Sequence, residues 1–416
     1  MLRDIIITQK RELESKFLER YVERNIDYSL FNNDLIKVII GPRRAGKSFL
    51  GIHYLKNTNN FGYLNFDDER ILEIKNYDEI ITNIDAIYGN PKTLLFDEIQ
   101  NLPNWELFVN RLHRNGRNLI VTGSNSKMLS KELATHLTGR HIPVIVFPFS
   151  FAEFIMMDRI EFTETEKNTK LYDYLQYGGF PEPLIKRIDV KNYLSILFNA
   201  ILYKDIISRY SIRYPAQLDV VASYLISNIA KEYSYNTLSK ITKINNIRTI
   251  EKYINYLEEA FIFFKVNRFS FKLKEQLTYN KKIYCIDNGL IYSKAISYTK
   301  NRGQLLENVV AIVLKKQELN GKLRFYFWKN QQGEEVDFVV QQGNTIGWLI
   351  QVCYDITNLE TLEREKRSLL KASKELSCNN VIILNCEVEK EEIFQWYGNR
   401  VTIRFIPLWK WLIKFG

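Results

Sequence analysis

Five short apolar runs in the first 150 residues constrain the fold more than any other feature of the sequence. Each run is rich in β-branched or aromatic residues, and predicted helical segments separate one run from the next. Strands that are apolar on both faces are typical of a parallel sheet that is covered by helices on both sides. The sequence therefore predicts an α/β domain with strands at residues 35–40, 62–66, 93–96, 119–122 and 142–147.

A loop bracketed by glycines follows the first of these strands and precedes a predicted helix. Gly41 and Gly46 let the backbone wrap closely around phosphate groups, so that N–H groups and the helix N-terminus face anionic oxygen. We expect Lys47 to reach the β- and γ-phosphates of ATP and the Ser48 hydroxyl to bind Mg²⁺. The predicted nucleotide-binding residues are Gly41, Pro42, Arg43, Arg44, Ala45, Gly46, Lys47, Ser48 and Phe49.

An acidic pair, Asp97 and Glu98, follows the third apolar run. We expect the Asp97 carboxylate to help hold Mg²⁺, and we expect Glu98 to orient or deprotonate the attacking water. One further strand, residues 62–66, separates the phosphate loop from Asp97 along the chain. This order and the adjacent glutamate favour a nucleotide hydrolase with an additional strand in its sheet, rather than a kinase.

Three more polar residues are candidates for the same site. Ser124 or Asn125, after the fourth run, is placed to sense the γ-phosphate, although turn formation accounts for these residues as well. Arg140 precedes the fifth run and has two candidate roles: action on the γ-phosphate of its own subunit, or a finger in the site of a neighbouring subunit. A surface arginine unrelated to the site would have the same spacing.

Length and composition indicate a globular protein with two to four domains, since 416 residues exceed one ordinary core. No stretch approaches the roughly 20 apolar residues of a membrane helix, and the N-terminus lacks the features of a signal peptide. We therefore expect a cytoplasmic protein that does not enter a membrane. The four cysteines and four histidines predict neither a disulfide framework nor a zinc site.

The net charge of +10 is typical either of a protein with a polyanionic partner or of a soluble, lysine-rich surface. The charge is concentrated. Residues 231–282 contain 11 Lys/Arg and 5 Asp/Glu, so 11 minus 5 gives this segment +6 of the total.

Several motifs in combination resemble the prokaryotic, largely archaeal, AAA+-type ATPases whose C-terminal domain is related to PD-(D/E)xK nucleases. The resemblance covers nearly the whole chain, implies an ATPase, and supports roles for Arg140 and for Ser124 or Asn125. It does not supply a physiological task. The motifs are Gly41–Ser48, Phe96–Gln100, Thr122–Asn125, Leu137–Arg140, Phe147–Phe154, Tyr177–Glu182 and Leu202–Ile206.

Residues 216–300 combine predicted helices, strands and basic side chains. A helix at 237–244 with Thr237 near its N-cap, a turn, and a second helix precede strands at 261–266 and 282–286. This order is that of a winged-helix fold, which binds DNA or serves as a lid or subunit contact. The candidate DNA-binding residues are Arg248 and Lys252 on the second helix and Arg268, Lys272 and Lys274 on the wing.

Residues 301–416 have the order helix, three strands, helix and a final strand at 381–384, which resembles the PD-(D/E)xK core. Active members supply Asp and then Glu-x-Lys from a pair of strands. Here Glu307 and Asp337 are retained, whereas Gln351 stands at the glutamate position and Cys353 at the lysine position. Gln351 still offers a carbonyl oxygen to a metal, but Cys353 cannot replace an ammonium group at neutral pH. We therefore expect a degenerate, non-catalytic domain.

The predicted domains are an AAA+-like P-loop ATPase domain (1–150), a helical lid or linker (151–215), a winged-helix-like module (216–300) and a nuclease-like domain (301–416). The leading functional hypothesis is a DNA-associated ATPase, with DNA as partner and the oligomeric state open. The alternatives are an ATP-dependent switch that scaffolds protein partners, and an ATP-driven nuclease, which Cys353 disfavours.

Overall fold

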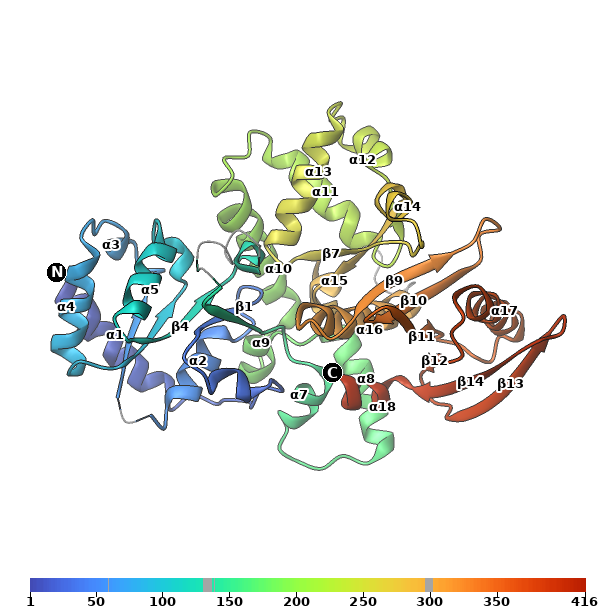
Figure 1. The fold of residues 1–416 in the computed structure, drawn as a ribbon, viewed down its shortest axis with the longest axis horizontal. Helices are drawn as coiled ribbons and strands as arrows, with labels where there is room; N and C mark the ends of the chain where they lie inside the picture. The colour runs from blue at the N-terminus through green and yellow to red at the C-terminus, as the bar shows by residue number, and fades with distance from the viewer. Residues whose placement is uncertain (59, 130–136, 138, 296–301) are drawn as a thin grey trace. The chain divides into compact units, whose positions relative to one another are not determined.

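The computed structural model describes residues 1–58, 60–129, 137, 139–295 and 302–416. Thr138 of the predicted Leu137–Arg140 motif lies outside these residues. The described chain divides into two units (Figure 1). Unit 1 contains residues 1–148 and 259–261, and unit 2 contains residues 149–258 and 262–416.

Unit 1 is built on a five-stranded sheet in the order β2-β3-β4-β1-β5, in which all neighbouring strands are parallel. The five predicted strands are confirmed, and β4 separates β1 from β3, as expected for a sheet with an additional strand. The strands are β1 (Ile36–Ile40), β2 (Phe61–Asn65), β3 (Thr93–Asp97), β4 (Asn118–Gly123) and β5 (His141–Ile145).

Helices cover both faces of this sheet. The chain passes from β1 to β2 in one direction across the sheet and from β2 to β3 and β3 to β4 in the other. Because such crossovers are right-handed, α2 lies on one face, and α4 and α5 lie on the opposite face (Figure 1). The helices are α1 (Leu2–Lys16), α2 (Lys47–Leu55), α3 (Glu69–Leu72), α4 (Tyr77–Tyr88) and α5 (Trp105–Arg114), with 3₁₀ turns η1 (Tyr28–Phe31), η2 (Ile99–Asn101) and η3 (Ser126–Leu129).

The first part of unit 2 is helical, as predicted. Ser150 and Thr163 begin two of its helices with capping boxes, in which each side chain bonds the backbone N–H of a glutamate that bonds back. Gly178 ends α8 with a φ of 70°, so the predicted turn at 177–181 is present. The elements are α7 (Phe151–Met156), α8 (Glu164–Tyr177), α9 (Pro181–Lys186), α10 (Val190–Ala200), the π-helical η4 (Ile201–Ser208) and α11 (Pro215–Ser227).

A three-stranded antiparallel sheet, in the order β6-β8-β7, follows together with four short helices. The N-cap of α12 is Ser234, whose hydroxyl accepts the N–H of Thr237, so the predicted cap at Thr237 was three residues late. The elements are β6 (Glu232–Tyr233), α12 (Tyr235–Thr242), α13 (Ile247–Glu259), β7 (Phe263–Val266), α14 (Leu273–Thr278), β8 (Lys281–Cys285) and α15 (Asn288–Lys294).

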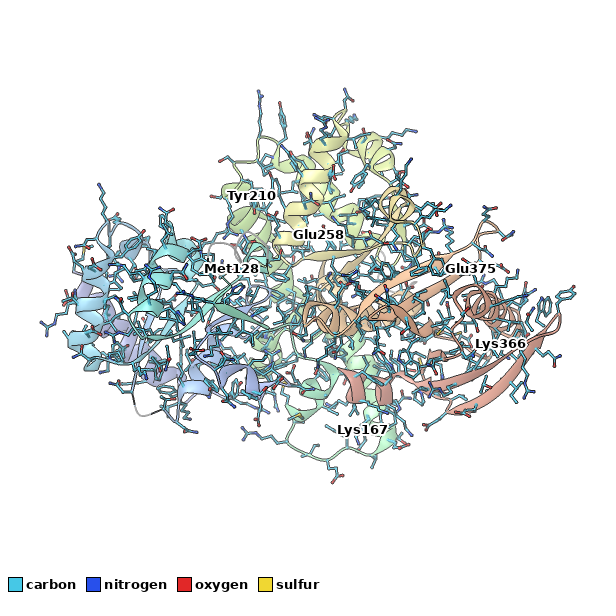
Figure 2. The ribbon with its side chains drawn as sticks, viewed as in Figure 1. Met128, Lys167, Tyr210, Glu258, Lys366 and Glu375 are labelled. Atoms are coloured by element: carbon cyan, nitrogen blue, oxygen red, sulfur yellow. The ribbon has the colours of Figure 1, made fainter. Side chains whose placement is uncertain are left out.

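A six-stranded mixed sheet, in the order β13-β14-β12-β11-β10-β9, completes unit 2. The prediction that 381–384 is the last strand was wrong, because β13, β14 and α18 follow it. Lys366 of α17, which is labelled in Figure 2, pairs with Glu392 of β13 and so joins the helix to this unpredicted hairpin. The elements are α16 (Arg302–Leu319), β9 (Arg324–Lys329), β10 (Glu335–Gln342), β11 (Thr345–Val352), α17 (Leu359–Leu376), β12 (Val381–Asn385), β13 (Lys390–Trp396), β14 (Asn399–Pro407) and α18 (Leu408–Phe415).

Within the described part of the chain, no helix has both the length and the apolar character needed to cross a membrane.

Candidate nucleotide-binding site

The glycine-bracketed loop joins the carboxyl end of β1 to the first turn of α2. Gly41 is required by close packing, because a Cβ atom there would lie 1.8 Å from the carbonyl oxygen of Val146. Gly46 has a φ of 94°, which disfavours any side chain, and it directly precedes α2. The Lys47 side chain is buried, and its Nζ donates to the carbonyl oxygen of Pro42 at 2.9 Å. The ammonium group therefore lies within the curve of the loop.

Arg24, which lies before β1 and was not among the predicted site residues, binds this loop through hydrogen bonds. Its buried guanidinium donates to the carbonyl oxygen of Ala45 at 2.8 Å and to that of Phe147 at 2.5 Å. Hydrogen bonds from a charged donor are stronger than neutral ones. The loop and the chain after β5 are thus held by one cation, which an isolated arginine in a sequence does not reveal.

Asp97, at the end of β3, meets three hydroxyl groups. Its Oδ1 accepts hydrogen bonds from Ser48 at 2.7 Å and from Thr122 at 2.5 Å, and its Oδ2 accepts one from Tyr63 at 3.3 Å. Burial, followed by the neighbouring Glu98 charge, raises the pKa of Asp97, and the hydrogen bonds of Thr122 and Ser48 oppose this. Ser48 and Asp97 offer the adjacent oxygen ligands that Mg²⁺ prefers, so the donor set fits this ion.

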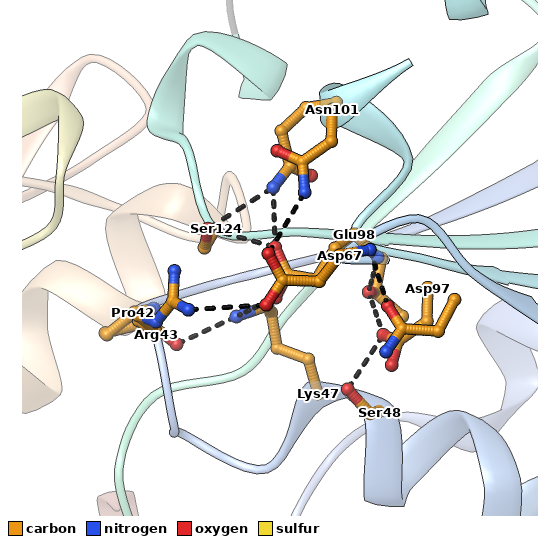
Figure 3. Close-up of polar contacts among 12 residues, drawn as sticks. Pro42, Arg43, Lys47, Ser48, Asp67, Asp97, Glu98, Asn101 and Ser124 are labelled. Carbon is orange, nitrogen blue, oxygen red and sulfur yellow. Dashed lines mark hydrogen bonds and ion pairs between the residues drawn. The ribbon is translucent and has the colours of Figure 1, made fainter. Parts of the chain in front are cut away.

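Glu98 occupies a strained position beside the loop, with a φ of 51°. Its Oε2 accepts hydrogen bonds from Gln100 at 2.5 Å and Ser124 at 3.1 Å, and its Oε1 lies 3.8 Å from Nζ of Lys47 (Figure 3). Burial alone would raise the pKa of Glu98, but the Lys47 charge and the Gln100 hydrogen bond outweigh burial and lower it. Glu98 is therefore an ionised carboxylate at neutral pH, as a group that accepts a proton from water must be.

The structure brings Ser124 into this cluster and places Asn125 next to it, with both side chains buried after β4. Thr122 also belongs to the cluster, because its hydroxyl accepts the N–H of Glu98 at 3.0 Å while it donates to Asp97. Sequence reasoning missed the roles of Thr122 and Gln100, although both lie in motifs that it quoted.

Other residues of the predicted loop lie at its rim. Arg43 pairs with Asp67 at 3.4 Å, and Asp67 also accepts a weak hydrogen bond from Asn101 at 3.5 Å (Figure 3). Arg44 is exposed with a φ of 64°. Phe49 packs near the His53 ring on α2, with 6.0 Å between the ring centroids.

Arg140 does not lie with these residues. Its carbonyl oxygen accepts the N–H of Ile36, which is the first residue of β1, and Arg140 itself precedes β5. In a parallel sheet this is the amino-terminal edge, opposite to the edge that carries the phosphate loop, Asp97 and Glu98. The candidate role of Arg140 in its own subunit is therefore wrong, and the trans role stays a prediction.

Four of the five candidate DNA-binding side chains in unit 2 are exposed, and the fifth binds other groups of the protein. Arg248 and Lys252 are exposed on α13, and Lys272 and Lys274 are exposed at the start of α14. Arg268 is partly buried: its guanidinium donates to the carbonyl oxygen of Lys329 and lies over the ring of Tyr279, 4.2 Å from the centroid.

The predicted nuclease-like residues do converge. Asp337 on β10 is joined to β11, because its N–H donates to Oε1 of Gln351 at 3.1 Å and its Oδ2 accepts the N–H of Val352 at 2.9 Å. Lys282 of β8, which was not among the predicted site residues, pairs with both Glu307 on α16 and Asp337. The Cys353 thiol is turned to the carbonyl oxygen of Asp355. Among the described residues, no group of three or more His, Cys, Asp or Glu side chains could hold a metal ion.

Comparison with known proteins divides the chain into three family regions. Residues 33–155 match a family described as an AAA domain, residues 168–300 match a domain of unknown function, DUF8612, and residues 302–410 match another, DUF4143. The uncharacterized protein MJ1544 of Methanocaldococcus jannaschii is 33% identical over all of this chain and 96% of its own length. An uncharacterized protein of Haemophilus influenzae is 30% identical over 81% of this chain and 86% of its own length.

Solved structures also give distant matches. One is Drosophila ORC bound to AT-rich DNA and Cdc6, with 8% identity, 70% of this chain and 91% of that chain covered, and a TM-score of 0.20. Another is the assembly of Thermococcus gammatolerans McrB AAA+ hexamers with bound McrC, with 11% identity, 65% and 79% covered, and a TM-score of 0.23.

Proposed function

We propose that this chain, which belongs to the same family as the Methanocaldococcus jannaschii and Haemophilus influenzae proteins, binds and hydrolyses ATP. Its residues 33–155 match the AAA domain. The observation that carries the proposal is the convergence of Lys47, Ser48, Asp97 and Glu98 at one edge of a parallel sheet. A glycine-rich turn with no role in phosphate binding would not be expected to place its lysine and serine beside two adjacent carboxylates.

Each side chain has a role that its contacts support. Lys47 leaves the Pro42 carbonyl to bind the β- and γ-phosphates, and Ser48 with Asp97 holds Mg²⁺, which would neutralise charge on the phosphate oxygens. Glu98 accepts the proton of the attacking water. Ser124 and Gln100 orient the Glu98 carboxylate by donating to its Oε2.

Arg140 lies outside its own site, and we propose that it serves the site of a neighbouring subunit. Its exposed position at the amino-terminal edge of the sheet supports this role. The proposal therefore includes a homo-oligomer.

We further propose that residues 216–300 form a winged-helix module and that residues 301–416 form a nuclease-like domain without catalysis. The order α11, β6, α12, α13, β7, β8 supports the first proposal. The order α16, β9, β10, β11, α17, β12 supports the second, and the thiol of Cys353 at the lysine position argues against cleavage of DNA.

DNA is the partner that the exposed charges of this module favour. Arg248 and Lys252 are one helical turn apart on α13, so they face the same side. Lys272 and Lys274 add two further exposed ammonium groups, although Lys272 pairs with Glu275 at 3.2 Å. Arg268 is omitted from this surface, because its guanidinium binds within the protein.

The direct test is ATP turnover with and without duplex DNA, over a series of salt concentrations. We expect DNA to stimulate turnover, and we expect Arg248→Ala with Lys252→Ala to weaken DNA binding and flatten its salt dependence by roughly 0.9 per lost phosphate contact. A matched control is Lys374→Ala with Arg400→Ala, which removes the same charge from exposed positions elsewhere in unit 2. Equal DNA binding by both double variants would refute the assigned surface.

A second candidate function, an ATP-dependent switch that binds a protein, is favoured by one observation. Phe271, Leu273 and Leu277 at α14 are 75%, 69% and 63% exposed, which is unusual for large apolar side chains so close together. Turnover that does not respond to any DNA, double-stranded, single-stranded or forked, would favour this alternative.

A further inference from the structure

Lys282 enters the carboxylate cluster of the six-stranded sheet from a different sheet. It lies on β8, and its Nζ is 2.9 Å from Oε1 of Glu307, 2.5 Å from Oε1 of Glu335 and 3.7 Å from Oδ1 of Asp337. These acids come from α16 and β10. One ammonium group therefore bridges three carboxylates that are 25 to 55 residues further along the chain.

Most of the cluster is buried. The side chains of Lys282, Asp337 and Glu307 are 3%, 9% and 12% exposed, whereas that of Glu335 is 28% exposed. The ammonium group also lies over an aromatic ring, with Nζ 5.6 Å from the centroid of Phe327. A divalent ion that works on a phosphodiester needs open positions for water and for the phosphate, and the burial of Glu307 and Asp337 disfavours such positions.

Protein donors already bind oxygen atoms of two of these acids. Tyr284 donates its hydroxyl to Oε1 of Glu307 at 2.7 Å, beside Lys282, and the N–H of Val352 donates to Oδ2 of Asp337. The carbonyl oxygen of Gln351, the one ligand that the altered motif still offered, accepts the N–H of Asp337. A metal ion would therefore have to compete with these donors for Oε1 of Glu307 and for Asp337.

Ammonium groups offset part of the negative charge of the cluster. Lys329 adds a second one, 3.8 Å from Oε2 of Glu335, and it also pairs with Glu232. Burial alone would lower the pKa of Lys282, but the charge of Glu307 and then those of the other acids raise it well above its usual value. Burial raises the pKa of Glu307 and, more strongly, that of Asp337. Lys282 is thus the cation that the buried acids of this cluster stabilise.

We propose that the ammonium group of Lys282 is the cation of this site: it takes the place of a divalent metal ion among Glu307, Glu335 and Asp337, and it ties the three-stranded sheet to the six-stranded one. The carboxylates of residues 301–416 are thus neutralised in part by a lysine from residues 216–300. Among the described residues, divalent-ion dependence is then expected at Ser48 and Asp97. This inference is independent of ATP hydrolysis, because it is tested without nucleotide.

The test is binding of Mn²⁺ to the nucleotide-free full chain, measured from the electron paramagnetic resonance signal of free Mn²⁺. Lys282→Met keeps the length of the side chain and removes its charge. We expect Lys282→Met to bind one more Mn²⁺ than the wild type does. The dissociation constant of this extra site should be at least about tenfold lower than that of any Mn²⁺ bound to the same carboxylates in the wild type. Its melting temperature should fall in metal-free buffer and rise again with Mn²⁺. Adding Asp337→Asn should abolish the extra Mn²⁺ site.

Lys281→Met is the matched control, because it removes a neighbouring, partly buried lysine of β8 that has no contact with the cluster in the described interactions. We expect it to bind Mn²⁺ as the wild type does. Wild-type binding of Mn²⁺ that disappears in Asp337→Asn would overturn the proposal. A folded Lys282→Met protein without extra Mn²⁺ would overturn it too.

A second variant decides the matter if Lys282→Met does not fold. Lys282→Met with Glu335→Gln removes one positive and one negative charge together, so folding should return and the melting temperature should approach that of Glu335→Gln alone. If the double variant stays unfolded while Glu335→Gln folds, the charge of Lys282 is not what holds the carboxylates, and the proposal fails.

Discussion

Replacement of Glu98 by glutamine tests the proposed chemistry most narrowly. Glu98→Gln preserves the shape of the side chain and an acceptor oxygen for Ser124 or Gln100, which donate to Oε2 of Glu98 at 3.1 Å and 2.5 Å. It removes the negative charge that Lys47 stabilises from 3.8 Å and the lone pair that would take a proton from water. The loop, Ser48 and Asp97 are left unchanged.

The expected loss follows from the role of a general base. Such a group contributes about 10²- to 10⁴-fold to a rate, which corresponds to roughly 3 to 5 kcal/mol of activation free energy. The lowered pKa of Glu98 means that the carboxylate is already ionised at neutral pH, so the full effect is lost on substitution. Binding of ATP should not weaken, since removal of a negative charge beside the phosphates reduces repulsion.

The assay combines phosphate release at saturating ATP with equilibrium binding of a fluorescent ATP analogue. We expect a fall in kcat of at least about a hundredfold with unchanged or tighter binding. Glu73→Gln, at an exposed position after α3, serves as the control and should behave as the wild type does. If Glu98→Gln turns over ATP within about threefold of the wild type, Glu98 is not the base.

Four other substitutions probe the site and the fold. Lys47→Ala should abolish tight ATP binding, because it removes the ammonium group inside the loop; retained affinity in the same binding assay would contradict this. Thr122→Val removes one of the three hydroxyl donors of the buried Asp97 carboxylate and leaves the N–H of Glu98 without its acceptor, so it should lower the free energy of unfolding by roughly 2 kcal/mol; Thr122→Ser should restore it, and denaturant titration measures both. Arg140→Ala and Lys47→Ala should each be inactive alone but regain turnover when mixed, because each supplies what the other lacks; a mixture without activity would argue against a trans role. Burial raises the pKa of Asp287 from 3.8 to about 7, so the folded state keeps a proton that the unfolded state loses, and the free energy of unfolding falls as pH rises through this window; melting temperatures from about pH 5 to pH 8 should lose that slope in Asp287→Asn.

The parallel sheet of unit 1 was readable from sequence because each strand is buried on both faces. Ile36–Ile40 and Thr93–Asp97 are nearly continuous apolar runs, and such a pattern needs no knowledge of distant contacts. The positions of Ser48, Asp97 and Glu98 follow from the same pattern, since parallel strands end at the same edge. The edge that Arg140 occupies also follows from the sheet, but only once β5 is known to start at His141.

The C-terminal hairpin and the Lys282 cluster could not be predicted in this way. β13 reads Lys-Glu-Glu-Ile-Phe-Gln-Trp, with most of its residues exposed, so it lacks the apolar pattern of a buried strand. Lys282 looked like one basic residue among many in residues 231–282, and its partners lie in a region that the sequence assigned to another domain. Arg24 was hidden for the same reason, since its partners are carbonyl oxygens at residues 45 and 147. Long-range ion pairs and bonds to backbone carbonyls leave no local trace in a sequence.

The central claim is that the loop from Gly41 to Ser48 and the pair Asp97 and Glu98 form one site that hydrolyses ATP. Its most direct test is phosphate release from ATP and Mg²⁺ by the wild-type chain, with and without duplex DNA, beside Lys47→Ala under the same conditions. The account predicts repeated turnovers by the wild type and none above background by the variant. Wild-type release no greater than that of Lys47→Ala in every condition would contradict it.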